Sequence, residues 1–524
     1  MGSETWGERG ARAAAIAAGV APYLGTIGHG FTLDDANTIE GHLGVKGPLS
    51  LENVFLRDWW GRSQFDTIGT WRPLATLTFW FDQRLGGGRS WAFHLTNLVL
   101  YAALLALAER FLARWCEGAL SRPGRLVSIA LFGVLAIHAD VVPSPTGRAE
   151  ILAALFSLGA VFAATCTEQL TGGTTAAAVL AIGCALLSKE SATPMAVLVP
   201  LLAYRAHASR NGVPRAPLAS LAAACFGLLA AVALFRATHM PFMSLGTERA
   251  LENPLLAVNG PRRLLGACEV LALYLGHTFT GLGLAPDYSF SEPPLLREGP
   301  LTILVGGLVV VAFAALLLRS WRNAPRLADA LLGFGASYVA VSNFLTPASA
   351  IADRLFFFPS FWLVLVIALL VERTARLPAT RAFAFVAAVL FALWIGARSA
   401  RYAALWKDDL TLLSAAMRAY PNVFRTQRNL AHALADAHED EEAAWHLAVA
   451  EAIYAGYPSP FARDAIAPAW REEPLGARLD HLRDLVGAKA ACAAASVAGA
   501  RLKSWDAPDA AAALSRWRER GCPP

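Results

Sequence analysis

Long apolar runs separated by short polar connections extend over most of this chain. A membrane-spanning helix needs about 20 mostly apolar residues, and such runs recur as far as residue 398. The pattern predicts an all-α polytopic membrane protein with about eleven transmembrane helices. The predicted spans are residues 12–31, 93–113, 125–142, 150–168, 175–188, 191–205, 216–236, 300–318, 328–347, 354–372 and 380–398.

Arginine-rich connections between the spans indicate the orientation. With a cytoplasmic N-terminus, these connections all face the cytoplasm, as the positive-inside rule requires. They comprise residues 110–125, 205–215, 319–326 and 373–381. The segment 262–284 is apolar enough to span, but a crossing there would move the connection 319–326 outside. We therefore expect this segment to be re-entrant or to lie along the interface, and the first apolar run to be an uncleaved anchor.

Two regions depart from the spanning pattern. A long first loop, residues 32–92, is predicted outside and contains five Trp residues that could anchor it at the bilayer surface or stack on a sugar. After Arg398 the composition becomes that of soluble helices, with two helices resembling a degenerate tetratricopeptide unit of about 34 residues. The sequence thus predicts a transmembrane domain, residues 1–398, and a small helical domain outside the membrane, residues 399–524.

Composition supports a membrane protein and argues against a nucleic-acid partner. Charged residues make up 16% of the chain, below the roughly 25% of soluble proteins. The net charge of +5 comes from Arg clusters between apolar runs, not from one basic face. There is no C-x-x-C motif, but Cys492 and Cys522 in the tail could form a disulfide if the tail is extracytoplasmic.

Ionisable and polar residues at span ends collect on the predicted outer side. Because charges are costly inside a bilayer, such residues are functional candidates. The group comprises Asp34, Asp35, Arg72, His94, Asn97, His138, Asp140, Arg148, Glu150, Lys189, Glu190, Asp287, Asp353 and Arg354. A carboxylate can deprotonate an incoming hydroxyl, and Arg or Lys can neutralise a departing phosphate. The mixture therefore predicts a polar cavity suited to group transfer from phosphate.

Each of these residues also has a structural explanation. Asp34 and Asp35 could be a solvated helix end, or carboxylate ligands of Mg²⁺ or Mn²⁺. Arg148 and Glu150 could form a structural ion pair, and the Lys-Glu dipeptide at 189–190 could mark a turn. Histidines at such positions are more often structural than catalytic.

Several motifs occur in an order that resembles a known family. They are FTLDDANTI (31–39), WRPLATLTFWFDQRLGG (71–87), FHLTN (93–97), HADVVPSPTGRAEILAALF (138–156), LLSKE (186–190), LAPDYSFSEPPL (284–295), ADRLFFFPS (352–360) and LWKDDLTLLSAAMRAYPN (405–422). On these motifs, the chain resembles the TMTC-type O-mannosyltransferases and their bacterial relatives, which are membrane glycosyltransferases of the GT-C class.

The resemblance implies that a mannose-like hexose moves from a polyprenyl-phosphate donor to a hydroxyl at the extracytoplasmic face, with inversion. It makes Asp34 or Asp35 the catalytic base, and Asp35 the candidate ligand of any divalent metal. The residues implied for the donor phosphate are Arg72, Lys189 and Arg354. Those implied for the sugar and acceptor pocket are His94, Asn97, His138, Arg148, Glu150, Glu190, Asp287 and Asp353.

The short tail departs from the long tetratricopeptide arrays of the eukaryotic proteins. The acceptor therefore stays open among protein, lipid and glycan. We expect a bacterial inner-membrane protein with a cytoplasmic N-terminus and a periplasmic C-terminal domain. The alternative is a non-catalytic membrane scaffold whose helical tail recruits partners.

Overall fold

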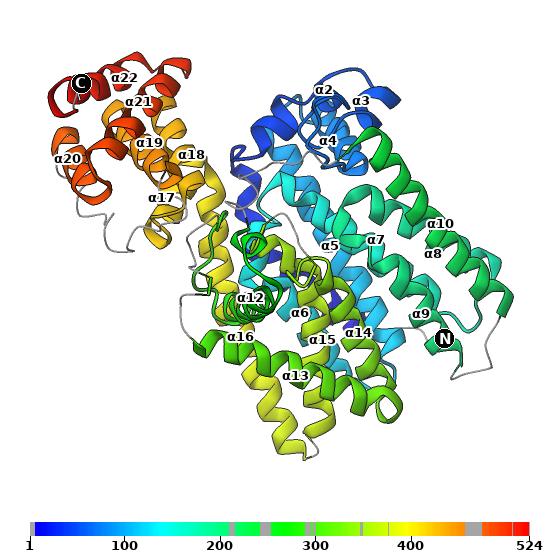
Figure 1. The fold of residues 1–524 in the computed structure, drawn as a ribbon. Helices are drawn as coiled ribbons and strands as arrows, with labels where there is room; N and C mark the ends of the chain where they lie inside the picture. The colour runs from blue at the N-terminus through cyan, green and yellow to red at the C-terminus, as the bar shows by residue number, and fades with distance from the viewer. Residues whose placement is uncertain are drawn as a thin grey trace.

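The computed structural model describes residues 6–208, 215–241, 253–288, 295–296, 300–345, 349–375, 377–455, 474–505 and 507–522. These residues form helices joined by turns, and the single bridge between Arg57 and Ser63 is their only β pairing. The prediction of an all-α protein is therefore confirmed for the described part of the chain (Figure 1).

The membrane part is a bundle of helices that begins with α1 (Trp6–Val20) and its 3₁₀ continuation η1 (Ala21–Gly28). Its other helices are α5 (Ser90–Trp115), α6 (Arg122–Val134), η3 (Ala136–Asp140), η4 (Pro145–Gly147), α7 (Arg148–Thr165), α8 (Gly172–Ser188), η5 (Glu190–Ala192), α9 (Met195–Ala208), α10 (Arg215–His239), η6 (Pro254–Ala257), α12 (Gly260–Thr280), α13 (Pro300–Asn323), α14 (Pro325–Val339), η7 (Asp353–Phe356), α15 (Phe357–Thr374), α16 (Pro378–Ala403) and η8 (Ala404–Lys407).

Six helical segments of the described chain are long and apolar enough to cross a membrane. They are Ser90–Trp115, Pro145–Thr165, Arg215–His239, Pro300–Asn323, Asp353–Thr374 and Pro378–Lys407. The other predicted spans also coincide with helices, but these are shorter or less apolar. The structure thus supports an integral membrane protein, whereas eleven crossings stay a prediction, as does the path of α12.

Close helix contacts and aromatic side chains build the core of this bundle. Trp115 and Trp362 are fully buried in it, with ring centroids 6.5 Å apart. A Cβ atom on Gly133 of α6 would overlap the Cα of Gly19 in α1. Glycine at both positions therefore lets the two helices cross at backbone contact.

The first loop folds into short helices at one end of the bundle. They are η2 (Ala36–Glu40), α2 (Leu43–Lys46), α3 (Leu51–Phe55) and α4 (Pro73–Leu85). Buried Asp58 fixes the loop between α3 and α4, accepting the backbone N–H of Trp60 at 2.9 Å and the hydroxyl of Thr67 at 3.0 Å. This loop brings Trp59 and Arg72 to the site described below.

The tail forms a second helical unit with its own apolar core. It comprises α17 (Asp409–Ala419), α18 (Phe424–Asp436), α19 (Asp440–Ala455), α20 (Leu475–Val486), α21 (Ala488–Ser504) and α22 (Pro508–Gly521). The tetratricopeptide character of this unit stays a prediction. The proposed bond between Cys492 and Cys522 is present and joins α21 to the end of α22.

Removing this disulfide is expected to loosen the tail. The bond closes a loop of 30 residues, and a cross-link that closes a loop of that size stabilises the folded state by about 3.6 kcal/mol on the chain-entropy account. Cys492→Ala with Cys522→Ala should therefore increase the rate of limited proteolysis after residue 474, relative to wild type. Cys225→Ala, which removes a buried unpaired Cys of α10, is the control and should leave the tail's proteolysis rate unchanged. A double variant as resistant as wild type would contradict the prediction.

Candidate functional site

A small polar cavity lies where the membrane bundle, the first loop and the tail meet. We call it the inner cavity; its volume is about 80 Å³. It is lined by Leu33, Asp34, Trp59, Arg72, Asp140, Ser144, Thr146, Gly147, Glu150, Lys189, Pro286, Asp287, Arg354, Trp406, Leu413, Arg425, Thr426 and Asn429. Seven of the candidate residues identified from the sequence are among these: Asp34, Arg72, Asp140, Glu150, Lys189, Asp287 and Arg354.

The three predicted phosphate-binding cations all face this cavity, and each pairs with a carboxylate. The Lys189 ammonium, at the end of α8, lies 2.5 Å from a carboxylate oxygen of Glu150 in the first turn of α7. Arg72, which precedes α4, lies 3.4 Å from Glu190. Arg354 lies 3.4 Å from Asp140. Five separate segments of the chain thus supply these cations and their carboxylate partners.

The two adjacent acids of the first loop have different environments. Asp34 is exposed and lines the cavity. Asp35 is fully buried, and its two carboxylate oxygens accept backbone N–H groups, from Thr32 at 2.9 Å and from Thr146 at 3.2 Å. Burial raises the pKa of Asp35 well above its ordinary value, against the effect of these hydrogen bonds. Asp35 therefore fixes the loop to η4, whereas the Asp34 carboxylate faces the inner cavity.

Burial and nearby charges also shift the pKa values of the two ionisable groups that follow α8. Burial lowers the pKa of Lys189, although Glu150 opposes the shift. For Glu190, burial acts to raise the pKa, but the nearby charges of Arg72, Arg236 and Lys189 and a backbone hydrogen bond hold the pKa below its ordinary value. Glu190 is thus an ionised carboxylate that holds two arginines at the edge of the cavity.

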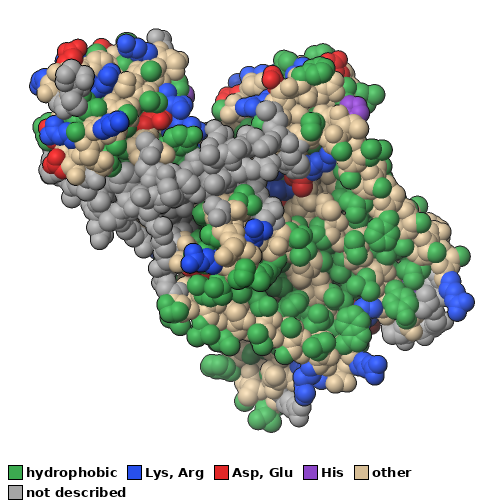
Figure 2. All heavy atoms as spheres, viewed as in Figure 1, with side chains coloured by type: hydrophobic (Ala, Val, Ile, Leu, Met, Phe, Trp, Pro, Cys, Tyr) green, Lys and Arg blue, Asp and Glu red, His purple; other side chains and the backbone are tan. Residues whose placement is uncertain are grey.

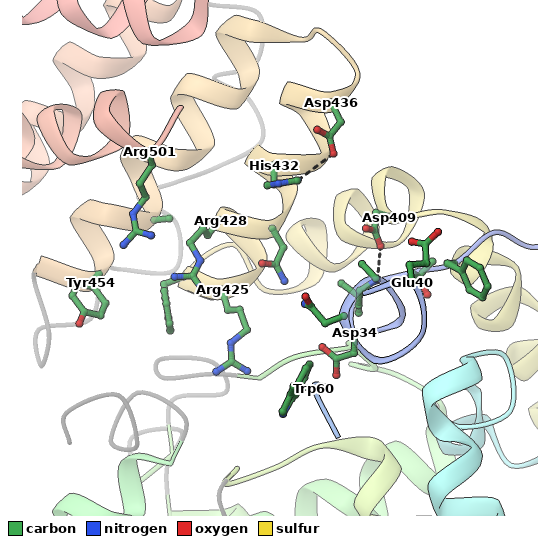
Figure 3. A pocket seen from close by; sticks show the side chains of 18 of the residues that line it. Asp34, Glu40, Trp60, Asp409, Arg425, Arg428, His432, Asp436, Tyr454 and Arg501 are labelled. Carbon is green, nitrogen blue, oxygen red and sulfur yellow. Dashed lines mark hydrogen bonds and ion pairs between the residues drawn. The ribbon is translucent and has the colours of Figure 1, made fainter. Parts of the chain in front are cut away.

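A larger cleft adjoins the inner cavity between the first loop and the tail. We call it the outer cleft; its volume is about 800 Å³, and it shares Leu33, Asp34, Arg425 and Asn429 with the inner cavity. Figure 2 shows the hollow between the tail and the loop helices. In Figure 3, Arg425 extends from α18 toward Asp34 and Trp60, while His432, Tyr454 and Arg501 line the tail side. Asp34 therefore stands at the junction of the two spaces.

Five of the site residues predicted from the sequence belong to the framework around the cavity. Arg148 is fully buried; it pairs with Asp82 at 2.5 Å and donates to Asn97 at 2.8 Å. His94 bonds the Gly30 carbonyl at 3.1 Å.

The remaining framework residues are His138 and Asp353. His138 bonds Tyr101 and Ser360, each at 2.9 Å. Asp353 bonds His277 at 2.8 Å and accepts the Tyr288 hydroxyl at 2.5 Å. None of the five lines the inner cavity, and Glu190 lies just behind Arg72.

Some lining residues were not among the site residues predicted from the sequence, although Trp59 is one of the five Trp residues of the first loop. Trp59 lies beneath Arg72, with the guanidinium carbon 4.9 Å from the ring centroid. Arg425 and Asn429 reach the cavity from α18, where the Arg425 guanidinium lies 3.6 Å from Asp287. The amphipathic pattern of α18 gave no sign that this face meets the membrane domain, because many exposed helices carry such residues.

The carboxylates do not fit a metal site well. Both oxygens of Asp35 already accept N–H groups, and Glu150 and Asp140 are paired with cations. Within the described ranges, no group of three or more His, Cys, Asp or Glu side chains is placed to hold a metal ion. We therefore assign no step to a metal.

Similarity to known proteins agrees with the motifs that line the cavity. A protein O-mannosyl-transferase of Caenorhabditis elegans, F38B6.6, is 26% identical over 444 residues, which cover 80% of this chain. Mouse TMTC3 is 22% identical over 453 residues, again 80% of the chain, and Drosophila Tmtc2 is 36% identical over 134 residues, 25% of the chain. The chain is homologous to the TMTC-type protein O-mannosyl-transferases. It spans only part of them, with 59% of the worm protein, 48% of mouse TMTC3 and 14% of Drosophila Tmtc2 covered.

The other two comparisons give nothing further. No family model matches the chain, and no solved structure matches it significantly. The resemblance to TMTC-type enzymes drawn from the motifs is confirmed.

Proposed function

We propose that this protein is a membrane glycosyltransferase that moves a mannose-like hexose from a polyprenyl-phosphate donor to an acceptor hydroxyl at the extracytoplasmic face. One observation carries the proposal: Asp34 shares the inner cavity with Arg72, Lys189 and Arg354. Homology to protein O-mannosyl-transferases supports it. The disulfide of the tail supports an oxidising, extracytoplasmic compartment.

The proposed reaction is a direct displacement at the anomeric carbon. The Asp34 carboxylate takes the proton of the acceptor hydroxyl while the oxygen of that hydroxyl bonds to the anomeric carbon. The bond from the carbon to the phosphate oxygen breaks, and the leaving polyprenyl phosphate keeps the electron pair. The transition state resembles an oxocarbenium ion, and the guanidinium and ammonium groups stabilise the charge on the phosphate.

The two spaces suit different parts of the substrates. The inner cavity, at about 80 Å³, is far below the roughly 300–1,000 Å³ of typical ligand sites. In the proposal it receives the phosphate, and the sugar and acceptor extend past Asp34 into the outer cleft. The acceptor class, whether protein, lipid or glycan, stays open.

Arg354→Lys tests the role of the cations. Its side chain is 35% exposed, the most accessible of the three cations, so it can reach a ligand. Lysine keeps the charge but loses the two-pronged hydrogen bonding of guanidinium to phosphate, so we expect KM for the donor to rise about tenfold with kcat less affected. The exposed Arg401→Lys is the matched control and should match wild type. An unchanged KM in Arg354→Lys would remove this residue from phosphate binding.

The direct test is transfer in nanodiscs. Purified protein receives radiolabelled polyprenyl-phosphate sugars and host membrane extract, with and without EDTA. Label moving to an acceptor establishes the activity, and an EDTA-sensitive rate would show that a metal is needed. The scaffold hypothesis is favoured by one observation, that each cavity cation already has a carboxylate partner. If the protein neither binds nor consumes any donor, the scaffold hypothesis becomes the better explanation.

A further inference from the structure

A second site lies at the other end of the membrane bundle, away from the inner cavity. There the ends of α6, α15 and α16 separate and leave an apolar groove of about 530 Å³. Its walls include Val127, Leu131, Ile367, Val371, Phe385 and Ala388. Figure 1 shows the hairpin of α15 and α16 at the lower end of the molecule, and the loop helices α2 to α4 at the upper end.

The groove opens into a polar pocket of about 650 Å³. The two spaces share Leu120, Ser121, Glu372 and Arg381. The pocket is also lined by Arg373 and by Arg326, which lies 4.0 Å from the carboxylate of Asp329. Figure 2 shows Lys and Arg side chains gathered at this lower end, below a hydrophobic band.

One oxygen of the Glu372 carboxylate in the pocket accepts two hydrogen bonds. Glu372 accepts the Ser121 hydroxyl at 2.7 Å and the Ser121 backbone N–H at 3.2 Å. Arg381 lies 4.0 Å from Glu372, with 57% of its side chain exposed, and Arg373 is also exposed. Helix α14 begins at Pro325 in the pocket lining without a side-chain cap. The positive end of its dipole therefore adds to the positive charge of the arginines.

Three of the four basic connections that the sequence places in the cytoplasm meet here. The pocket is built from residues 118–121, 323–327 and 372–373, together with Arg381. An apolar groove between membrane helices that ends in a basic cytoplasmic pocket has the form of a site for an anionic lipid. The groove can take an acyl chain, and the arginines can take the phosphate.

We propose that this groove and pocket bind one anionic glycerophospholipid of the cytoplasmic leaflet, with an acyl chain between α6 and α16 and the phosphate at Arg373 and Arg381. The site is separate from the transfer cavity, so it does not depend on the proposed function. Arg326 lies 4.0 Å from Asp329, so the cations left for a headgroup are Arg373 and Arg381. Together with the positive end of the α14 dipole, they outweigh the single hydrogen-bonded carboxylate and favour an anionic headgroup over a zwitterionic one.

Native mass spectrometry of the full protein in detergent can test this proposal. The probes are dioleoylphosphatidylglycerol and dioleoylphosphatidylcholine, added to protein stripped of lipid. Wild type should retain one phosphatidylglycerol in clear preference to phosphatidylcholine. Arg373→Gln with Arg381→Gln should weaken that binding at least about tenfold, the scale expected for losing two cations near an anionic headgroup.

Matched controls separate a built site from general attraction to charge. Arg319→Gln with Arg322→Gln removes two exposed arginines from the same predicted face, outside the pocket, and should bind like wild type. Ala388→Phe fills the groove without changing charge, so this variant should also lose the lipid. It tests the proposal independently if the variant that lacks Arg373 and Arg381 does not fold.

Three outcomes would overturn the proposal. Equal retention of both lipids by wild type would mean that the headgroup is not recognised. Equal losses in the two double-arginine variants would mean that the attraction is not local. Undecaprenyl phosphate displacing phosphatidylglycerol at lower concentration would make the occupant a polyprenyl lipid.

Discussion

Asp34→Asn is expected to lower the transfer rate by about 10²- to 10⁴-fold, the usual contribution of a general base, while the protein stays folded. Asp34 is exposed at the junction of the inner cavity and the outer cleft, and asparagine has nearly the same shape but cannot take a proton from the acceptor hydroxyl. The measurement is the initial rate of label transfer in nanodiscs, at saturating donor, with a melting curve for each variant.

Two further substitutions make this result specific. Asp66→Asn removes an exposed carboxylate of the same loop outside both spaces and should leave the rate unchanged. Asp35→Asn keeps one accepting oxygen but replaces the other with an NH2 group, which cannot accept the backbone N–H group that faces it. The loss of that hydrogen bond costs about 1–3 kcal/mol when the group is buried. This variant should lower stability more than the rate of the folded fraction. A folded, inactive Asp35→Asn beside an active Asp34→Asn would reverse the assignment.

Arg148→Leu is expected to destabilise the membrane domain by about 3–5 kcal/mol, the usual effect of removing one partner of a buried ion pair. Arg148 of α7 pairs with Asp82 of α4, and it donates to Asn97 and to the Phe93 carbonyl of α5. The variant leaves the Asp82 carboxylate buried without its counterion. A fall in the melting temperature of purified protein in detergent is the measurement.

The partner residue supplies the decisive comparison. Asp82→Leu combined with Arg148→Leu removes both charges, so this double variant should be more stable than Arg148→Leu alone. Arg114→Leu, at an exposed position on α5, should melt like wild type. If Arg148→Leu melts like wild type, the network is not a structural link between α4, α5 and α7.

Local sequence was enough to predict that the chain is helical and enters a membrane. Apolar runs of helix length have few alternatives in a bilayer, because the backbone must satisfy its own hydrogen bonds there. The same reasoning failed to settle how many runs cross. Only six described segments meet the length and hydropathy expected of a span, and shorter helices such as α6 and α9 can be buried by their neighbours.

The positions of the polar residues relative to the predicted spans grouped several of them together. Asp34, Arg72, Lys189 and Arg354 were grouped from span ends alone, and the structure brings them into one cavity. Tail residues such as Arg425 were missed, since nothing in a soluble amphipathic helix identifies the face that docks onto a distant domain.

The sequence by itself determined the class of protein, the set of polar residues near one end of the predicted spans and the resemblance to TMTC-type enzymes, because these depend on composition and on short motifs. Tertiary structure alone decided which groups pair. Arg148 pairs with Asp82 rather than with nearby Glu150, and Glu150 pairs with Lys189. Tertiary structure also decided that Asp35 is buried whereas its neighbour Asp34 is exposed. Pairing and burial depend on contacts between segments far apart in the chain, which a one-dimensional pattern does not contain.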